Sequence, residues 1–513
     1  MSFDKKIKEF KNKKESFVDK EAIKVQHKKG KLTARERLDL LLDKDSFTEI
    51  GTFVELDSDD EELQKKAKAG DGVITGQGTI NKRPVYIYAQ DFTFMGGSMG
   101  EGHTRKIANV IGLALKMGMP IIGLLDSGGA RIQEGIGGLD GGGEIFLKNT
   151  LASGVIPQIS TILGPCAGIA VYSPALTDFV IMTEKTSNMF ITGPDVIKAV
   201  TGEVIDFEKL GGASTHNSKS GVSHFNADSE KEAIKMIKML FNYLPQNNLE
   251  NPPLVNMGDN PNRLNNNLKD IVPVDQKKAY DVKDVLKEVM DKNSFFEIHE
   301  HYAPNAVVGF GRLNNQVIGM VANQPKMLAG CLDNNCSDKI ARFVRFCDCF
   351  NIPLINFVDV TGYLPGSEQE HNGIIRHGAK MLYAYSEATV PKISLVMRKA
   401  YGGAYIALVS KDMGYDKVVA WPFAEIAVMG AEQAVNIVNR KELKSSKNPD
   451  KVKQQRIEEF SEKFLNPYVA AKKGKVDIII EPKDTRKTLI SCLDMLMSKR
   501  EKRPAKKHGN IPL

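Results

Sequence analysis

Three glycine-rich turns, each directly after an apolar segment, have the clearest chemical potential in this sequence. They read SGGARIQEG after PIIGLLD, PCAGIAVYS after PQISTILG, and KAYGGAYIAL after PKISLVMR. A strand that ends in glycines and opens a helix directs several backbone N–H groups at one point, where they stabilise an oxyanion without reorganising. Ligands bind in the loops that follow the strands of α/β sheets, so we expect Gly128, Gly129 and Ala130 to contact the substrate.

Side chains that commonly perform catalysis do not form a recognisable motif. The sequence has no G-x-x-x-x-G-K-[ST] phosphate loop, no H-E-x-x-H and no G-x-S-x-G elbow, and we expect no metal site. We assign His371 and His377 structural roles. Glu134 and Glu144 could serve as acid and base in a hydratase, although capping or solvated roles are commoner for such residues. Oxyanion donors without an evident nucleophile indicate enolate chemistry.

The composition is typical of a globular protein with two domains. The apolar fraction is 42% and the charged fraction 26%, and 513 residues exceed one ordinary hydrophobic core. The net charge of +7 suits an anionic ligand but is too small to indicate nucleic-acid binding. Six cysteines without a C-x-x-C pair indicate reduced thiols in a cytoplasmic protein.

Neither a signal peptide nor a transmembrane segment is expected. The Lys-rich N-terminus lacks the apolar region of a signal peptide. The apolar stretch 155–182 is interrupted by three prolines. A bilayer does not tolerate such an irregular backbone, so a buried strand–turn–helix is the better interpretation.

The two halves of the chain repeat each other. A G-x-G hairpin pairs Gly76 with Gly309, and the apolar segments MPIIGLLDSGG and IPLINFVDVTG pair Asp126 with Asp359, both at a spacing of 233. VIPQIS and VPKIS match at a spacing of 234. Three anchors at nearly constant offset predict two copies of one fold. Buried strands that alternate with amphipathic helices make each copy an α/β unit.

The repeat sets the expected domain boundaries. We predict a charged helical segment over residues 1–30 and an N-terminal domain over 31–250. A stretch rich in Asn and Pro marks a linker over 251–270, and the second domain spans 271–513.

Longer motifs run in order through the chain and carry a family resemblance. They include GKLTARERLDLLLD, DSGGARIQEG, ASGVIPQIS, FITGPDV, NQPKMLAGCLD, GIIRHGAKMLYAYSEATVPKI, RKAYGGAY and KKHGNIPL. From about residue 30 to the end, the chain resembles the carboxyltransferase subunits of biotin-dependent acyl-CoA carboxylases and decarboxylases. Propionyl-CoA carboxylase beta chains and methylmalonyl-CoA decarboxylase alpha chains are the most similar groups.

The resemblance implies a fold, an assembly and an activity. The family has two crotonase-like (ClpP/crotonase) domains and forms a homo-hexamer, with each active site between the N-domain of one subunit and the C-domain of another. Carboxyl transfer between biotin and propionyl-CoA or methylmalonyl-CoA is the implied reaction. The N–H groups of Gly403 and Ala404 would hold the ureido oxyanion of biotin, and those of Gly168 and Ile169 the thioester enolate.

Partner chains must supply biotin and the driving reaction. The sequence contains no A-M-K-M attachment motif and no ATP-grasp segment, so biotin is expected on a biotin carboxyl carrier protein. A further partner is either a biotin carboxylase subunit or the membrane subunit of a sodium-pumping methylmalonyl-CoA decarboxylase. The chain is expected in the cytoplasm, or peripherally at the inner membrane face if it belongs to such a pump.

Several positions depart from the family pattern. Ile169 replaces the second glycine of GPCAGGA, and DVPGFLPG reads DVTGYLPG. A positive φ at Ile169 would cost about 1–3 kcal/mol in strain, and otherwise its side chain would narrow the acyl pocket. Ile406, two residues past Ala404, is expected either to line that pocket or to belong to the core. A crotonase-type hydratase and a non-catalytic scaffold subunit are the alternative functions.

Overall fold

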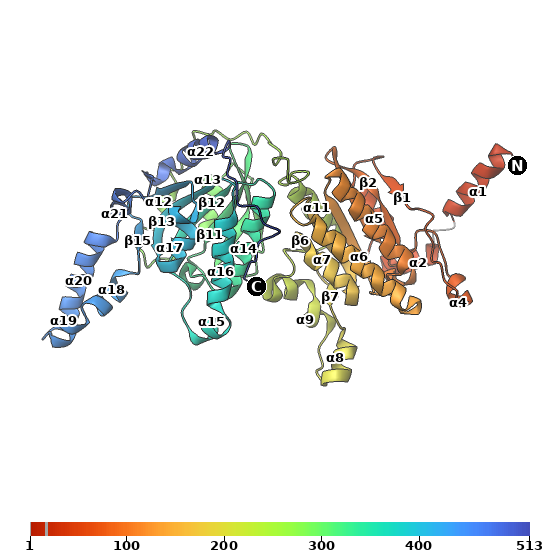
Figure 1. Ribbon diagram of the computed structural model, residues 1–513, viewed down its shortest axis with the longest axis horizontal. Coiled ribbons are helices and arrows are strands. Elements are labelled where there is room, and N and C mark those ends of the chain that lie inside the picture. The colour runs from red at the N-terminus through yellow and green to blue at the C-terminus, as the bar shows by residue number, and fades with distance from the viewer. Residues whose placement is uncertain (1, 16–18, 513) are drawn as a thin grey trace. The chain divides into compact units, whose positions relative to one another are not determined.

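The computed structural model describes residues 2–15 and 19–512. The chain divides into two compact units, 1–250 and 251–513, each built on its own mixed sheet (Figure 1). The predicted α/β class and the duplication are confirmed, because the two sheets have the same strand order. The segment 251–270 belongs to the second unit, where Asn265 and Leu268 are fully buried.

The first sheet has the order β1-β2-β3-β4-β5-β6-β8, with β7 paired to β5. β1, β2 and β3 are antiparallel, and the pairs from β3 onward are parallel. The strands are β1 Thr48–Ile50, β2 Val73–Ile80, β3 Arg83–Gln90, β4 Ile121–Ser127, β5 Gln158–Ala167, β6 Phe179–Thr183, β7 Asn188–Phe190 and β8 Phe225–Ala227.

The second sheet repeats this arrangement as β9-β10-β11-β12-β13-β14-β16, with β15 paired to β13. A Cβ at Gly76 of β2 would lie 2.3 Å from Thr48 O, and one at Gly309 of β10 would lie 2.3 Å from Phe296 O. The repeated glycine is therefore required by the close approach of the edge strand. The strands are β9 Phe296–Ile298, β10 Ala306–Leu313, β11 Gln316–Asn323, β12 Leu354–Val360, β13 Lys392–Tyr401, β14 Lys417–Ala420, β15 Glu425–Ala427 and β16 Ile478–Ile479.

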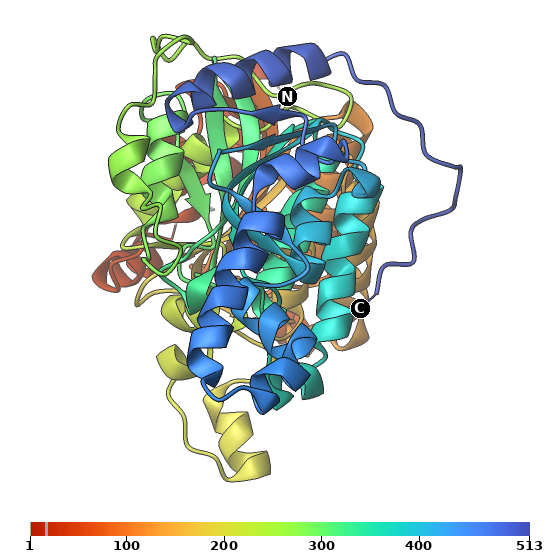
Figure 2. The same cartoon turned by 90° about the vertical axis from the view of Figure 1, so that its left-hand side faces the viewer.

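Helices cover the first sheet, and α5 and α6 pack side by side. α8 and α9 extend from the body of this unit (Figure 1 and Figure 2). The α-helices are α1 Phe3–Glu15, α2 Lys20–Lys28, α3 Ala34–Leu41, α4 Glu61–Gln64, α5 Glu101–Met117, α6 Ile136–Ala152, α7 Tyr172–Leu176, α8 Pro194–Thr201, α9 Phe207–Gly211, α10 Ala213–Thr215 and α11 Glu230–Phe241. Short helical turns span Met95–Gly97, Ile132–Glu134, Gly168–Val171 and His216–Ser220.

In the second unit α14 and α16 form the corresponding pair, and α18, α19 and α20 extend from its body. The α-helices are α12 Leu268–Ile271, α13 Val282–Val289, α14 Asn334–Cys349, α15 Ser367–His371, α16 Ile374–Glu387, α17 Gly402–Val409, α18 Ala431–Val438, α19 Arg440–Ser445, α20 Pro449–Phe464, α21 Pro467–Lys472 and α22 Thr485–Leu496. Short 3-10 turns span Leu328–Gly330, Lys411–Met413 and Pro482–Asp484. No helix within the described residues combines the length and apolar character needed to cross a membrane.

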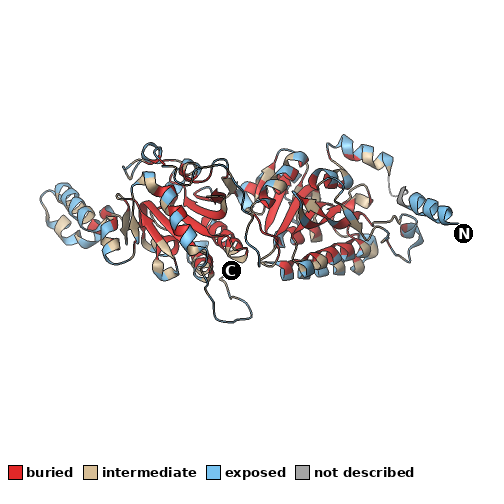
Figure 3. Ribbon diagram, turned by 90° about the horizontal axis from the view of Figure 1, so that it is seen from above, coloured by how far each residue is buried: buried red, intermediate tan, exposed pale blue. Residues whose placement is uncertain are grey.

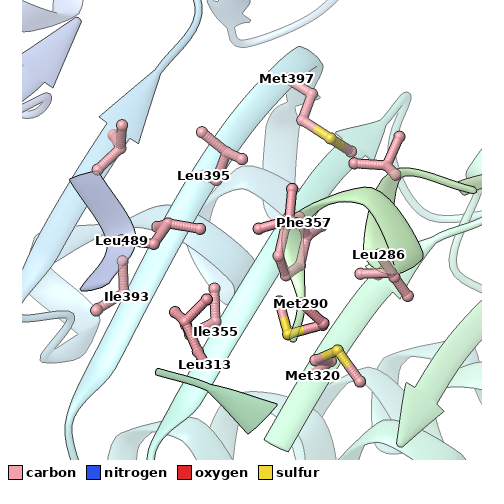
Figure 4. Packing of buried hydrophobic residues seen from close by; sticks show 14 of the residues in the cluster. Leu286, Met290, Leu313, Met320, Ile355, Phe357, Ile393, Leu395, Met397 and Leu489 are labelled. Carbon is pink, nitrogen blue, oxygen red and sulfur yellow. The ribbon is translucent and has the colours of Figure 1, made fainter. Parts of the chain in front are cut away.

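The central strands are buried on both faces, as their continuous apolar sequences predict (Figure 3). In the second unit, Ile355 and Phe357 of β12 pack beside Ile393 and Leu395 of β13, under Leu286 of α13 (Figure 4). Alternate residues of adjacent parallel strands thus share one face and one core.

A buried carboxylate ends β4 in the first unit. Asp126 accepts hydrogen bonds or ion pairs from Lys31 Nζ at 2.6 Å and from Arg37 Nη1 at 3.0 Å. Arg37 also pairs with Glu230, 2.7 Å away, and its own side chain is fully buried. A Cβ at Gly164 would lie 1.9 Å from Asp126 Oδ1, so only glycine leaves room for this cluster. The cluster ties the N-terminal segment to the sheet.

The second unit places a different cation beside the equivalent carboxylate. Asp359 of β12 pairs with Arg398 Nε at 2.8 Å, and both side chains are buried. Arg398 occupies the position that Gly164 takes in the first unit, at the repeat spacing of 234. Its guanidinium also donates to the carbonyl oxygens of Pro273, Asp275 and Lys278. Each buried charge is therefore paired, as burial in a low dielectric requires.

We predict that Arg37→Met lowers the free energy of unfolding by about 3–5 kcal/mol, because Asp126 and Glu230 lose a buried partner. Arg35→Met is the matched control, since Arg35 is 47% exposed and pairs with Glu49 at the surface. It should cost less than about 1 kcal/mol. Urea denaturation of both variants measures the difference, and equal losses would contradict the role of the buried cluster.

Candidate active site

The first catalytic candidate is the point where β5 ends at Ala167 and the helical turn Gly168–Val171 begins. Gly168 has φ +59°, a conformation that favours glycine, whereas Ile169 lies outside the left-handed region. The strain considered for Ile169 is therefore absent. N–H groups in the first turn of a helix have no intrahelical acceptor. Gly168 and Ile169 are the first two residues of the helical turn, so their N–H groups are potential donors to a ligand.

The side chain of Ile169 packs against the first unit's own core. A Cβ added at Gly142 of α6 would lie 3.2 Å from Ile169 Cδ1. Ile169 is partly buried and packs against the hydrophobic cluster of this unit. Its bulk is thus accommodated by a glycine on the facing helix.

The loop after β4 is held by its own backbone. Gly128 N donates to Gly96 O at 3.0 Å, and Gly129 N donates to Ser127 Oγ at 3.1 Å. Gly128 is exposed, Gly129 is buried and Ala130 is half-buried. The N–H groups of both glycines therefore donate within the loop and do not serve as donors to a substrate. These glycines can contact a substrate only through the shape of the loop surface.

This loop and the Gly168 turn lie side by side. Gly129 has φ +99°, and a Cβ there would lie 2.7 Å from Ala167 O, the residue before Gly168. The structure thus brings together two of the three turns singled out in the sequence. A side chain at position 129 would force them apart.

An ion cluster behind the loop fixes its direction. Arg131 is buried and pairs with Asp71 at 2.7 Å and with Glu134 at 2.6 Å. Glu134 also accepts from Glu101 N at 2.6 Å, at the start of α5. Burial lowers the pKa of the adjacent His103 to about 3, so this histidine is neutral.

The hydratase alternative gains no support from these carboxylates. Glu134 is occupied by Arg131 and by the start of α5. Glu144 is exposed on α6. A hydratase would need two carboxylates beside the Gly168 turn. Among the described residues, no contact brings Glu134 or Glu144 together with a second carboxylate there.

The second catalytic candidate is the turn between β13 and α17. Gly402 has φ +57° and takes the place that Gly168 has in the first unit, so Gly403 corresponds to Ile169. The pair Gly403 and Ala404 is therefore shifted by one residue relative to the pair Gly168 and Ile169. The repeat spacing of 234 in the sequence already contained this signal.

Sequence reasoning did not assign Tyr363 to this site. Tyr363 stands at the repeat position of Ala130, and its ring lies 3.5 Å from a Cβ built at Gly403 and 3.1 Å from one built at Gly378 of α16. Its hydroxyl has no hydrogen-bond partner among the described residues, and burial raises its pKa. The signal was the departure to DVTGYLPG, whose tyrosine fills the space beside the turn.

A second contact supports the same turn from β15. The Tyr401 hydroxyl, one residue before Gly402, donates to Glu425. Burial raises the pKa of Glu425 and that of Tyr401. The pair joins the last residue of β13 to the first residue of β15.

The remaining candidates lie nearby or apart. Ile406 of α17 is 47% exposed, so it is not a core residue of this chain. His377 contacts Asp338 Oδ2 of α14 at 2.8 Å, a contact between helices, and His371 is exposed. No group of three or more His, Cys, Asp or Glu side chains among the described residues could hold a metal ion.

The first unit also contains a cavity of about 520 Å³ at the carboxyl end of β3. Its lining contains three basic side chains, Lys11, Arg35 and Lys68, and three acidic ones, Asp19, Glu49 and Asp91. Arg35 pairs with Glu49 at 3.0 Å, and Lys68 pairs with Asp19 at 3.4 Å. Residues Met95–Gly97, after the end of β3, contact the loop after β4. The charges of the lining therefore balance, so the cavity shows no preference for an anionic group.

Known proteins match this chain over its full length. The family described as carboxyl transferase domain matches residues 25–511. A propionyl-CoA carboxylase carboxyltransferase subunit of Haloferax mediterranei is 55% identical over 100% of both chains. The methylmalonyl-CoA decarboxylase alpha subunit of Veillonella parvula is 55% identical over 96% of this chain and 95% of that protein. The structure of the transcarboxylase 12S hexamer with methylmalonyl-coenzyme A bound matches with a TM-score of 0.97 and 51% identity, covering 100% of this chain and 99% of that one.

We predict that Ile169→Gly lowers the free energy of unfolding by about 2–4 kcal/mol, because it removes a packed side chain and relieves no strain. Ile406→Gly should cost only about 1 kcal/mol, the penalty for glycine at an exposed helix position. Urea denaturation compares the two. A more stable Ile169→Gly protein would show that the turn is strained after all.

Proposed function

Because this chain belongs to the carboxyl transferase family, we propose that it transfers a carboxyl group between biotin on a partner chain and a short-chain acyl-CoA. Propionyl-CoA and methylmalonyl-CoA are the proposed pair, since full-length relatives at 55% identity are named for them. The observation that carries the proposal is the pair of strand–glycine–helix turns, one in each unit of a duplicated fold.

Each turn has a separate task in this reaction. The N–H groups of Gly168 and Ile169 would stabilise the enolate oxygen of the thioester. The loop over Gly128, Gly129 and Ala130 would shape the thioester side of this unit.

The second unit fits the ureido group of biotin. Two consecutive N–H groups at the start of α17, those of Gly403 and Ala404, suit a carbonyl oxygen that gains negative charge. When bound, biotin supplies the site that carries the carboxyl group. Tyr363 closes the protein side of the turn, so the donors face a single direction. The protein contributes orientation and fixed dipoles.

The relatives suggest which partners to propose. We propose a biotin carboxyl carrier protein as one partner, and a biotin carboxylase subunit or a membrane decarboxylase subunit as another. A homo-hexamer is the proposed assembly, since the matching 12S structure is a hexamer. The second candidate function is that of a subunit of a sodium-pumping decarboxylase, which the 55% identity to a decarboxylase subunit favours. The chain would act in the cytoplasm, or at the inner membrane face if it belongs to such a pump.

We predict biotin-dependent loss of CO2 from methylmalonyl-CoA when the purified protein is given free biotin. Gly403→Pro should lower turnover about 100- to 1000-fold, because it removes one oxyanion donor worth about 2.7–4 kcal/mol. Gly403 tests the turn well, since its N–H belongs to the donor pair in either register. A proline is tolerated in the first turn of a helix.

Acyl-CoA binding and the thermal midpoint control for folding in this experiment. Both should stay close to the wild type, since the first unit holds CoA. A folded and fully active Gly403→Pro enzyme would refute the assignment of the turn. A wild type that is silent with both methylmalonyl-CoA and malonyl-CoA would favour the scaffold alternative.

We propose further that the exposed side chain of Ile406 lines the acyl pocket, and we predict that Ile406→Asp lowers kcat/KM for propionyl-CoA about tenfold relative to acetyl-CoA. The carboxylate would face the methyl group that distinguishes the substrates. Ile437→Asp on α18, where the isoleucine is 64% exposed, is the matched control. If both variants keep the wild-type ratio of the two substrates, Ile406 does not contact the acyl group.

A further inference from the structure

A buried polar network lies at the far end of α17, the helix whose first turn carries Gly403 and Ala404. It comprises Asn356 of β12, Ser394 of β13, Tyr385 of α16 and Tyr415, which precedes β14. All four residues are buried, and none is more than 4% exposed. Polar side chains this deep in an apolar core are retained only when each is hydrogen-bonded.

Three of these side chains bind the last carbonyl groups of α17. Tyr415 Oη donates to Ala407 O at 2.7 Å, Asn356 Nδ2 donates to Leu408 O at 2.8 Å, and Ser394 Oγ donates to Leu408 O at 2.5 Å. The final carbonyls of a helix lack intrahelical donors. α17 has only eight residues, mostly apolar, so these contacts set its position along its own axis.

The network has one consistent arrangement of hydrogens. Leu408 O can only accept, so the amide NH2 of Asn356 faces it, and the same Nδ2 donates to Tyr415 Oη at 2.8 Å. Asn356 Oδ1 then accepts from Tyr385 Oη at 2.9 Å. A fully satisfied network of this kind is rigid and costly to rearrange.

The first unit anchors the corresponding helix with other side chains. In the first unit Gly123 occupies the repeat position of Asn356, and a Cβ there would lie 2.4 Å from the Tyr88 ring. The helix after the Gly168 turn, α7, has five residues and is anchored differently, with Ser173 Oγ donating to Asn149 Oδ1 at 2.8 Å. Ser160 stands at the repeat position of Ser394 and accepts from Thr177 Oγ1 at 3.1 Å. The part of the network centred on Asn356 is thus specific to the second unit, where the proposed biotin-side donors lie.

We propose that Asn356 and Tyr415 are positioning residues for carboxyl transfer, which fix α17 so that the N–H groups of Gly403 and Ala404 meet the ureido oxygen. This inference rests on the function proposed above. Donors of an oxyanion hole act only within a narrow range of distance, and small displacements of such groups reduce turnover strongly.

Two tyrosine-to-phenylalanine variants form a matched test. Tyr415→Phe removes a donor that binds α17 directly, whereas Tyr385→Phe removes one that donates to Asn356 and not to α17. Both delete a single buried hydroxyl, so both should lower the thermal midpoint by similar amounts. We expect Tyr415→Phe to reduce kcat about tenfold with an unchanged KM for methylmalonyl-CoA, and Tyr385→Phe to reduce kcat less than about twofold.

Amide hydrogen exchange of the peptide 402–409 gives a readout that does not depend on activity. It should accelerate in Tyr415→Phe and stay near the wild type in Tyr385→Phe. Equal exchange and equal kcat in the two variants would overturn the proposal. A wild type without biotin-dependent activity would overturn the function instead, and hydrogen exchange would still decide whether the network holds α17.

If Tyr415→Phe does not fold, Ser394→Ala takes its place. It removes one of the two donors to Leu408 O and leaves Asn356 in position. A reduced kcat with faster exchange over 402–409 supports the proposal, and wild-type values for both contradict it.

Discussion

Both units depend on a buried carboxylate at the carboxyl end of a central strand. An unpaired charge there would cost several kcal/mol, so each aspartate must have a cation within contact distance. Asp126 and Asp359 meet this requirement at equivalent positions. The loops that follow them, which shape the candidate site, therefore start from a fixed point.

The two copies meet the same constraint with different parts of the chain. In the first unit the cations come from Lys31 and Arg37, so the N-terminal segment becomes part of the domain. In the second, Arg398 lies on the sheet itself and binds carbonyls of the preceding segment instead. Gly164 and Arg398 occupy the same repeat position. Gly164 leaves room beside Asp126 for cations from the N-terminal segment, whereas Arg398 supplies the cation for Asp359 itself.

The candidate turns differ in the same manner. Both begin with a glycine at positive φ, because the chain must reverse from strand to helix within one residue. Around that shared bend the first unit has Ala130 and Ile169, and the second has Tyr363 and Gly403. The bulky residue comes from a different loop in each copy: Ile169 of the turn packs against α6, whereas Tyr363 of the loop after β12 lies between α16 and the turn. Two similar folds can in this way present unlike surfaces to two unlike ligands.

The family, the α/β class and the duplication could be predicted from the sequence, and all three are confirmed. They depend on local patterns: apolar runs, glycine turns and a constant spacing, each of which is visible within a few residues. The conformation of Ile169, the role of Tyr363 and the network around Asn356 required the tertiary structure. Their side chains are placed by partners 15 to 59 residues away, such as Gly378 for Tyr363 and Tyr415 for Asn356. Packing and hydrogen bonding between distant segments decide such positions, and no local pattern encodes them.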